Sequence, residues 1–375
     1  MVTLHKSLGD FKRVCYVRPE PELPVHRAIS DKLCTHLIIG FAIIENNVIR
    51  VDTKTGSFIS YCKALLNVTK TTGANDVQLM LSIGGGNNDQ GFHPMSSTPT
   101  NRRQFAISAL EIMLKYGLHG LDLDWEFPAW GNTYYEDKQN FYLVLKELRE
   151  IFTTFTVQTS RPPLVITVAL AAQYTIIERS YNVPELIKYV DFINLMAYDY
   201  YVYHWYWPFI DHNSPLFGRR RTQHLFIFGT LNTDWSANYY NRLGVPKDRI
   251  IIGIPTYGRS YQLMFPWYPR PGSLALASNQ DMSFTEVCRF LKTPGTTVEW
   301  DQESGVPYAY RDNQWLTFES RESAAQKVEW IIRNGFGGSM TFSLNADDYR
   351  NECYDNSQPF AIQSAIKEIS LKMLS

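Results

Sequence analysis

The sequence has little excess charge and few cysteines. Its 375 residues include 36 Lys and Arg against 37 Asp and Glu, a formal net charge of −1. Proteins that bind nucleic acids or anionic membrane surfaces need a clear basic excess, so this balance argues against both classes. The basic run Arg219-Arg220-Arg221 is interpreted as a solvated loop rather than a binding patch. The five cysteines show no metal-site spacing, and the sequence predicts neither a metal ion nor a cofactor.

Long apolar runs are also missing. No run reaches the roughly 18 residues that a membrane-spanning helix needs. The best candidate, Leu164–Ile177, is interrupted by Thr167, Gln173 and Thr175. The N-terminal segment MVTLHKSLGDFKR contains no apolar stretch of the kind found in signal peptides.

Aromatic residues, by contrast, are abundant. The chain has 9 Trp, 23 Tyr and 21 Phe, together 14% of its residues. So many rings exceed what a core alone usually needs, and flat apolar rings are a surface that proteins lay against sugars. The composition therefore hints at a carbohydrate ligand.

The cysteines allow two disulfides. Cys15 and Cys34 flank two successive predicted strands, which makes a bridge between them geometrically plausible. Cys288 and Cys353 could form a second bridge. Cys62 lies on a helical pattern and is interpreted as a buried thiol.

Short β-branched runs alternate with longer helical patterns along the whole chain. Most of these runs are nearly continuous apolar segments, as expected of parallel strands that are buried on both faces. The predicted strands are Arg13–Val17, Thr35–Ala42, Val77–Gly84, Gly120–Glu126, Leu164–Leu170, Val190–Tyr198, Arg249–Tyr257 and Gly338–Leu344. About eight strand–helix units predict an α/β fold, a closed (β/α)8 TIM barrel. A doubly wound open sheet is the alternative, but it rarely has eight units without a glycine-rich phosphate loop.

One interval, between the seventh and eighth predicted strands, departs from this rhythm. It contains several prolines and two short strand-like segments, Tyr308–Arg311 and Trp315–Phe318. We predict a small α+β insertion at residues 260–320. It belongs to a single barrel domain of residues 13–375, which follows an N-terminal extension of residues 1–12.

The segment Gly120–Pro128 places three carboxyl groups on alternate residues. Side chains of a strand alternate between its two faces, so Asp122, Asp124 and Glu126 point the same way, roughly 6.6 Å apart. Three buried carboxyls in one row are unfavourable unless they are paired or protonated, and crowding raises at least one pKa. Glu126 lies at the C-terminal end of its strand, where barrel enzymes keep their chemistry. The row therefore predicts a catalytic site in which Glu126 donates a proton to a leaving oxygen.

Two other interpretations of this row are weaker. A solvated edge strand would need polar residues on both sides of the run, and apolar residues flank it. A metal site is also disfavoured, because carboxylates on alternate positions of one strand converge poorly on a single ion.

The carboxyl row resembles the D-G-x-D-x-D-x-E signature of glycoside hydrolase family 18, which contains chitinases and chitinase-like lectins. Three further segments resemble family motifs in the same order along the chain, and the resemblance runs from about Arg13 to the C-terminus. These segments are Ser82-Ile83-Gly84-Gly85, Met196-Ala197-Tyr198-Asp199 and Pro255-Thr256-Tyr257-Gly258-Arg259.

The resemblance implies a retaining hydrolase in which the substrate's own 2-acetamido group replaces an enzyme nucleophile. Glu126 would protonate the glycosidic oxygen and later activate water. Asp124 would orient the acetamido N–H, and Tyr198 would donate to its carbonyl oxygen. Asp122 would take a proton when Asp124 turns toward Glu126. The implied substrates are β-1,4-linked N-acetylglucosamine chains, meaning chitin and its oligomers.

The resemblance also implies which residues bind the sugar. Trp205 is added to this set from the aromatic loop at residues 200–207, for which the alternative is a loop that packs on itself. The expected substrate-binding residues are Tyr16, Phe41, Gly85, Gly86, Phe127, Met196, Asp199, Trp205, Tyr257, Arg259 and Phe342.

Three positions depart from the family pattern. His119 replaces the first Asp of the signature; it could hydrogen-bond to Asp122, hold it ionised as an imidazolium, or be a core histidine. Gly86 replaces a cleft tryptophan after the paired glycines. Phe342 replaces the tryptophan that forms the floor of the site, and offers less ring area and no indole N–H.

Two functions from different classes follow. The intact carboxyl row with Tyr198 favours a chitin-hydrolysing enzyme, and the changed cleft residues favour a chitinase-like lectin that binds oligomers with little or no hydrolysis. In both cases the expected partner is chitin or an N-acetylglucosamine oligosaccharide, without nucleic acid or membrane. The predicted disulfides and the resemblance favour an extracellular or secretory location, although no signal peptide is visible.

Overall fold

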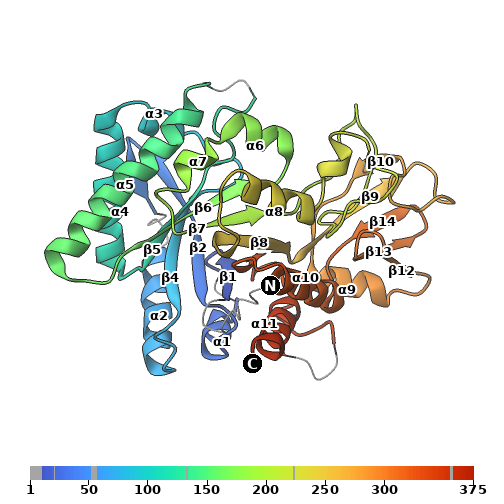
Figure 1. Ribbon diagram of the computed structural model, residues 1–375. Helices are drawn as coiled ribbons and strands as arrows, with labels where there is room; N and C mark the ends of the chain where they lie inside the picture. Colours follow the sequence, from blue (N-terminus) through green and yellow to red (C-terminus); the bar gives the residue numbers. More distant parts are fainter. Residues whose placement is uncertain (1–10, 21, 52–56, 132–133, 223, 355–357) are drawn as a thin grey trace. The chain divides into compact units, whose positions relative to one another are not determined.

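The computed structural model describes residues 11–20, 22–51, 57–131, 134–222, 224–354 and 358–375 (Figure 1). The chain divides into two compact units. The first unit contains Val14–Leu195 and Tyr240–Ile251, and the second contains Met196–Tyr239, Ile252–Ser375 and the residues up to Arg13. The predicted N-terminal extension lies outside the described residues except for Phe11 and Lys12, and Lys12 already begins the first strand.

The main sheet contains all eight predicted barrel strands. These are β1 (Lys12–Val17), β2 (His36–Glu45), β4 (Gln78–Gly84), β5 (Gly120–Asp124), β6 (Val165–Ala171), β7 (Phe192–Met196), β8 (Ile250–Pro255) and β15 (Gly338–Phe342). A short ninth strand, β3 (Val48–Arg50), pairs antiparallel with β2. The strand order is β1-β15-β8-β7-β6-β5-β4-β2, and β1 also pairs with β2, which closes the ring. The predicted (β/α)8 TIM barrel is therefore confirmed.

The barrel strands could be predicted from the sequence because they are buried and therefore apolar. All residues of β5 and of β8 are buried, so these strands consist of nearly continuous apolar runs apart from their functional positions. Each of the eight strands differs from its predicted range by one to three residues at one or both ends, and one of these differences affects the candidate site. Strand β5 ends at Asp124 rather than at Glu126, so Glu126 lies two residues beyond the hydrogen-bonded ladder.

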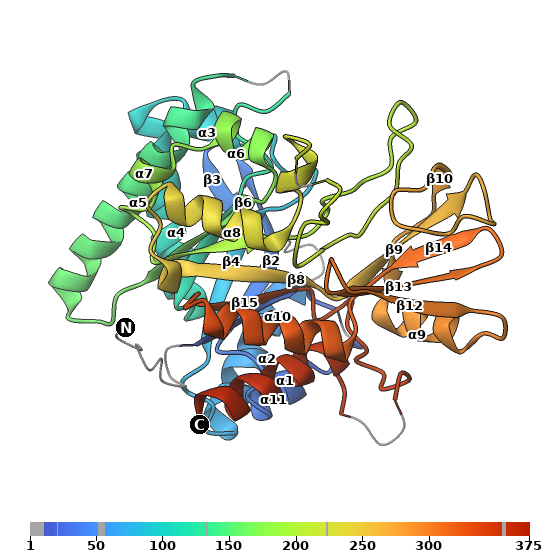
Figure 2. The same cartoon turned by 45° about the vertical axis from the view of Figure 1, so that its right-hand side comes forward.

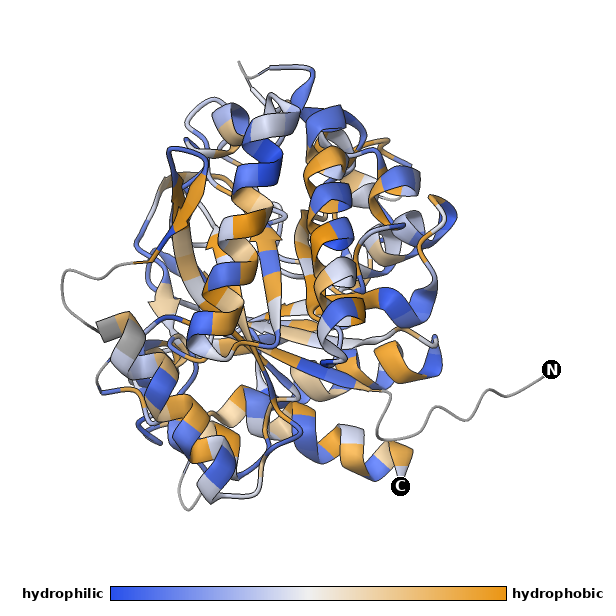
Figure 3. Cartoon of the chain, turned by 90° about the vertical axis from the view of Figure 1, so that its left-hand side faces the viewer, coloured by the Kyte–Doolittle hydropathy of each residue, from blue (hydrophilic) through white to orange (hydrophobic). Residues whose placement is uncertain are grey.

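Helices alternate with these strands. They are α1 (Val25–Ser30), α2 (Ser57–Thr71), α3 (Phe92–Ser96), α4 (Pro99–Tyr116), α5 (Asp137–Thr159), α6 (Tyr174–Ser180), α7 (Val183–Leu186), α8 (Thr233–Arg242), α9 (Phe284–Lys292), α10 (Arg321–Arg333) and α11 (Ala361–Leu374), with 3₁₀ turns at Phe228–Thr230 and Lys247–Arg249. Stripes of apolar residues run beside hydrophilic ones on these helices (Figure 3). Across the described ranges, no helix combines the length and the apolar character that crossing a membrane would require.

Helix α4 shows how local sequence sets an element's ends. The Thr98 side chain accepts a hydrogen bond from the backbone N–H of Asn101 at 3.1 Å and caps the first turn. The helix ends at Gly117, whose φ of 64° lies in the left-handed region that glycine tolerates. Phe105 and Ala109 of this helix are fully buried.

The second unit contains the predicted α+β insertion between β8 and β15. Its strands are β9 (Tyr257–Leu263), β10 (Ala275–Ser278), β11 (Met282–Ser283), β12 (Thr297–Asp301), β13 (Val306–Arg311) and β14 (Gln314–Thr317). They form an antiparallel sheet in the order β10-β9-β14-β13-β12, with β11 also on β9, and α9 packs against β9 and β11 (Figure 2). Tyr261 and Trp315 are fully buried in its core. Part of the high aromatic content of the chain therefore serves the core of the insertion. It begins three residues before the predicted start.

One interpretation in this unit is wrong. Arg219 is buried and forms an ion pair with Asp211, so it does not belong to a solvated loop. Arg220 and Arg221 are exposed, as that interpretation required. The error arose because a run of like charges gives no sign that one of its members has a buried acidic partner.

Both disulfides allowed by the sequence are present. Cys15 in β1 is joined to Cys34, two residues before β2. Cys62 is fully buried on α2, as predicted, and burial raises the pKa of its thiol to about 12. The thiol is therefore neutral and unreactive at ordinary pH.

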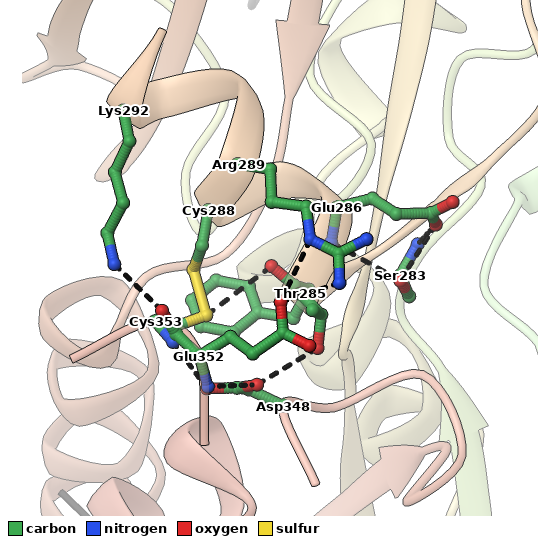
Figure 4. A network of polar contacts seen from close by, with 10 residues as sticks. Ser283, Thr285, Glu286, Cys288, Arg289, Lys292, Asp348, Glu352 and Cys353 are labelled. Carbon is green, nitrogen blue, oxygen red and sulfur yellow. Dashed lines mark hydrogen bonds and ion pairs between the residues drawn. A yellow bond between two sulfur atoms is a disulfide. The ribbon is translucent and has the colours of Figure 1, made fainter. Parts of the chain in front are cut away.

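The second disulfide, Cys288–Cys353, ties α9 to the chain that follows β15 (Figure 4). Asp348 supports this link. Its carboxylate accepts hydrogen bonds from Thr285 Oγ1 at 2.9 Å and from the backbone N–H groups of Glu352 and Cys353 at 3.0 and 2.8 Å. The covalent bond and the polar network thus hold the same two segments together.

Candidate active site

Asp122 lies in the middle of β5 and is surrounded by hydrogen-bond donors of the first unit. Ser82 and Thr167 are its register partners on the neighbouring strands, and their hydroxyls donate to it at 2.7 and 2.6 Å. Tyr16 Oη donates at 2.7 Å and Asn194 Nδ2 at 3.2 Å. Burial raises the pKa of Asp122 above its usual value, and these four hydrogen bonds offset part of that rise. Because donors satisfy both carboxyl oxygens, the arrangement suits an ionised carboxylate in a fixed position.

Asp124, two residues along the same strand, has the opposite environment. It is buried, and its Oδ1 atom has no hydrogen-bond partner in the described part of the chain. Burial raises its pKa well above the usual value, and the charges of Glu126 and Asp122 raise it further. Crowding in the row therefore favours the neutral acid at Asp124.

Glu126 follows the strand end and is half-buried. The peptide bond between Glu126 and Phe127 is cis, and Phe127 is also half-buried. Gly86 borders the acid: a Cβ atom built on Gly86 would lie 3.8 Å from Glu126 Oε1, with no other atom within 4 Å. The missing side chain at Gly86 thus leaves open space beside the candidate proton donor.

Tyr181, just after α6, is a further residue near the carboxyl row that was not predicted from the sequence. This tyrosine is buried, and its hydroxyl accepts a hydrogen bond from the backbone N–H of Ala171 at 3.1 Å. Burial raises its pKa well above the usual value, with smaller contributions from the charges of Glu126 and Asp124. It is therefore a neutral hydroxyl within the electrostatic reach of both carboxyls. Its sequence context resembles any buried tyrosine and gives no signal of this position.

The paired glycines after β4 permit a close approach to Asp124. A Cβ atom on Gly84 would lie 2.2 Å from the Asp124 carbonyl oxygen, and the Gly85 N–H donates to that oxygen at 2.9 Å. A Cβ atom on Gly85 would lie 3.0 Å from the Phe41 ring. Phe41 in turn neighbours Tyr16, with ring centroids 6.3 Å apart. A side chain at Gly84 would displace the end of β5 at Asp124, and a side chain at Gly85 would displace the Phe41 ring. Both positions therefore require glycine.

The opposite face of β5 is apolar, as the alternation predicted. Leu121, Leu123 and Trp125 are buried, and the Trp125 ring stacks on Phe92 with centroids 4.9 Å apart. The carboxyl row and the apolar row therefore occupy different faces.

His119 precedes the row and does not contact it. Its Nδ1 atom accepts a hydrogen bond from the backbone N–H of Leu79 at 2.9 Å, and burial lowers its pKa. It is not among the four groups that bind Asp122. Of the three alternatives, the half-buried histidine bound to backbone is the one observed, and the two that involve Asp122 are wrong.

The aromatic candidates of the second unit lie close to one another. The rings of Tyr198 and Phe342 are 6.1 Å apart and nearly parallel, and the Tyr257 ring meets Tyr198 edge-on at 6.2 Å. The Tyr198 hydroxyl contacts Met340 Sδ at 4.0 Å. Met196, at the end of β7, is half-buried.

Asp199 is the centre of a polar cluster in this unit. Its carboxylate accepts hydrogen bonds from the Tyr257 hydroxyl and from Arg259, whose Nε and Nη2 atoms are 3.0 and 2.8 Å away. Burial raises the pKa of Tyr257 well above its usual value, and the charge of Asp199 raises it further. The sequence analysis missed Asp281, which lies 3.4 Å from Arg259 Nη1. The cluster offers fixed donors and acceptors that suit sugar hydroxyl or amide groups.

Trp205 is the most exposed of the candidates, with 83% of its surface accessible. The alternative for its loop holds only in part. Within the loop, His204 stacks on Tyr206 with centroids 5.1 Å apart and Tyr206 meets Trp205 edge-on. Trp207 instead stacks on Phe228 outside the loop, and Trp205 and Tyr206 stay exposed. A sugar-stacking role for Trp205 remains a prediction.

The comparisons with known proteins show which family the chain belongs to. The family model of glycosyl hydrolases family 18 matches residues 12–347. Chitinase-3-like protein 2 of Homo sapiens is 31% identical over 375 residues, which cover 95% of this chain and 92% of that protein. The oviduct-specific glycoprotein of Sus scrofa is 30% identical, with 99% and 71% covered.

Similar solved structures include catalytic and non-catalytic proteins. Human YKL-39, described as a pseudo-chitinase with retained chitooligosaccharide binding properties, has a TM-score of 0.86 and 28% identity, with 96% of this chain and 100% of that chain covered. A Group IV chitinase of Ostrinia furnacalis in complex with allosamidin has a TM-score of 0.85 and 26% identity, with 98% and 100% covered. With a matching family model over most of its length, the chain belongs to glycosyl hydrolases family 18.

Proposed function

We propose that this protein hydrolyses β-1,4-N-acetylglucosamine linkages in chitin or chitooligosaccharides by a retaining, substrate-assisted mechanism. Asp124 carries the proposal: it is buried, has a strongly raised pKa and keeps one carboxyl oxygen unpartnered between Asp122 and Glu126. A fold gains no stability from such a group, and perturbed carboxyls of this kind are typical of catalytic sites.

In the first step, Glu126 gives its proton to the glycosidic oxygen as the bond to the anomeric carbon breaks. The acetamido oxygen of the same sugar attacks that carbon and forms a positively charged oxazolinium ring. Water then adds to the anomeric carbon and returns a proton to Glu126. The half-buried position of Glu126, next to the open space at Gly86, supports this role.

Asp122 and Asp124 stabilise the positive charge that develops on the acetamido group. Four hydrogen-bond donors fix Asp122 and favour its carboxylate form, and a negative charge in a buried environment acts strongly on a nearby cation. The free Oδ1 of Asp124 accepts the acetamido N–H. As the substrate becomes cationic, ionisation of Asp124 becomes less unfavourable, so the stabilisation is larger in the transition state than in the ground state.

The residues of the second unit hold the sugar in this proposal. Tyr198 donates to the acetamido oxygen and orients it for attack. Asp199 and Arg259 bind hydroxyl or amide groups, and Phe342 supports the apolar face of a sugar ring. The roles of the remaining expected binding residues, Tyr16, Phe41, Gly85, Gly86, Phe127, Met196, Trp205 and Tyr257, also belong to the proposal. The two disulfides support an extracellular location.

A chitooligosaccharide-binding protein without hydrolysis is the second candidate. Two observations favour it: YKL-39 is described as a pseudo-chitinase, and this chain has Gly86 and Phe342 where the family carries tryptophan. The retained Glu126 argues for hydrolysis, because that residue supplies the proton for the leaving oxygen.

Release of a fluorogenic group from chitobiose and chitotriose substrates tests the proposal. Wild-type protein should turn over, and Glu126→Gln should lose at least about two orders of magnitude in kcat, the usual size of a general-acid contribution. Glu111→Gln, the same change on the exposed surface of α4, is the matched control and should retain wild-type activity.

The result also separates the two candidates. Equal background rates for wild type and Glu126→Gln, with oligosaccharide binding retained in both, would establish the non-hydrolytic binder and reject the proposed hydrolysis.

A further inference from the structure

A cavity of about 570 Å³ lies within the second unit and uses none of the residues proposed to act in hydrolysis. The basic run Arg219–Arg221, Arg270 and the segment from Glu299 to Glu303, which includes Trp300, line it. Its volume falls in the range of small-molecule sites, roughly 300–1,000 Å³. Both acidic and basic groups face this space, so their other partners decide what it can bind.

The first acidic group, Glu299, is already bound on both oxygens. Tyr308 Oη donates to Oε2, and Tyr310 Oη donates to Oε1 at 2.9 Å. Burial raises the pKa of Tyr308, and its hydrogen bond to Glu299 raises it further. Both hydroxyls therefore remain protonated donors, and Glu299 has little capacity left for a ligand.

The other two acidic groups are occupied as well. Asp301 Oδ2 lies 2.9 Å from Nε2 of the buried His212, and Asp301 Oδ1 accepts the backbone N–H of Glu303 at 3.0 Å. Glu303 Oε2 accepts the backbone N–H of Arg220 at 3.1 Å. Asp301 is thus bound on both carboxylate oxygens, and Glu303 is bound on one.

The basic groups are less occupied. Asp211 neutralises Arg219, but no carboxylate in the described part of the chain forms an ion pair with Arg220, Arg221 or Arg270. Arg221 Nη2 donates once, to the backbone carbonyl of Pro271 at 2.8 Å. A guanidinium carries five N–H donors, so most donors of these three residues remain available. Three positive groups with available donors therefore line a space in which Glu299 and Asp301 are bound on both oxygens and Glu303 on one.

We propose that this cavity binds a sugar that carries a sulfate or phosphate ester. Guanidinium groups bind tetrahedral oxyanions through paired, charge-assisted hydrogen bonds, which accounts for the three arginines. The cavity volume of about 570 Å³ is larger than a bare ion needs, and Trp300 and Pro271 add apolar atoms to its lining, which accounts for the body of a sugar. The site is independent of the proposed hydrolysis.

Calorimetric titration of the full-length protein tests the site. N-acetylglucosamine 6-sulfate and N-acetylglucosamine 6-phosphate are compared with unmodified N-acetylglucosamine and with inorganic sulfate. At least one ester should bind about tenfold or more tightly than either comparison compound, and its affinity should fall as NaCl rises. The ester with the higher affinity identifies the biological source as sulfated or phosphorylated sugar.

The double variant Arg220→Gln/Arg270→Gln should lose at least about tenfold in ester affinity while keeping the wild-type unfolding midpoint and chitooligosaccharide turnover. Arg161→Gln removes an exposed arginine of the first unit and is the matched control. Its ester affinity should equal that of the wild type.

Three results would overturn the proposal. They are esters that bind no better than unmodified N-acetylglucosamine, inorganic sulfate that binds as tightly as the esters, and a double variant that binds the esters like the wild type.

Discussion

Two buried charged sites, one in each unit, show how a structural site differs from the proposed catalytic site. In the second unit, Lys327 and Glu319 are fully or almost fully buried and form an ion pair. Lys327 also donates to the Ser214 carbonyl at 2.6 Å, and Ser323 donates to Glu319 at 2.6 Å. Opposite charges are matched there, and their remaining hydrogen-bonding groups are satisfied.

In the carboxyl row of the first unit, the charges are not matched by opposite charges, and not every hydrogen-bonding group is satisfied. Asp122 is held by four neutral donors and no cation, and Asp124 carries like charges on either side and an unpartnered oxygen. A bound group that supplies positive charge and a hydrogen-bond donor would stabilise this row. The comparison teaches that the balance of partners, rather than burial, distinguishes the two sites.

The largest predicted effect comes from removing one charge of the buried ion pair between Lys327 and Glu319. Lys327→Met leaves Glu319 buried without its counter-charge, and the free energy of unfolding should fall by about 3–5 kcal/mol. The double variant Lys327→Met/Glu319→Gln removes both charges and should regain most of that loss. Urea unfolding measures both.

The exposed pair of Arg333 and Glu329, 2.9 Å apart, provides the control. Arg333→Met should cost less than about 1 kcal/mol, because exposed ion pairs contribute little. Equal losses in the Lys327 single and double variants would show that the charge balance is not what stabilises this region.

The next prediction concerns pH and the carboxyl row. The pKa of Asp124 is higher in the folded than in the unfolded state, so the unfolded chain loses its proton first as pH rises. The stabilising contribution is complete below about pH 4. Above it, the contribution declines by up to about 1.4 kcal/mol per pH unit until the folded pKa is reached. Asp124→Asn should therefore gain stability relative to the wild type over this range.

Chemical unfolding at a series of pH values measures this difference. Asp248→Asn, a change at an exposed position, should track the wild-type curve. If the curves of Asp124→Asn and wild type stay parallel from pH 4 upward, Asp124 does not hold a raised pKa.

The smallest predicted effect concerns the floor of the site. Phe342→Trp should tighten chitotriose binding by about 1 kcal/mol, roughly fivefold, because the larger ring covers more of the sugar. Calorimetry in the Glu126→Gln background keeps the ligand intact. Phe226→Trp enlarges an exposed ring elsewhere in the second unit and should change nothing. An unchanged affinity for Phe342→Trp would mean that this ring does not support the sugar.

The sequence predicted the barrel well, for a physical reason. Parallel strands that are covered on both faces must be apolar along their length, so β4 and β8 stand out from the helical patterns around them. The alternation of side chains on β5 likewise separated Asp122 and Asp124 from Leu121 and Leu123. Both signals lie within a single strand, so the sequence alone reveals them.

Features that depend on contacts between distant segments could not be predicted. Thr167 and Asn194 reach Asp122 from strands 45 and 72 residues away, through a register that the sequence does not encode locally. Lys327 looks like any lysine of a helix until its contacts with Ser214 and Glu319 are known. The assignment of the raised pKa to Asp124 also required the distribution of donors around the row.

The anomeric form of the first product tests the central claim most directly. Proton NMR of wild-type protein with chitohexaose should show the β-anomer first, followed by slow conversion to the equilibrium mixture, because attack by the acetamido group retains configuration. A product that appears first as the α-anomer, or no product at all, would contradict a substrate-assisted hydrolase built on Glu126 and Asp124.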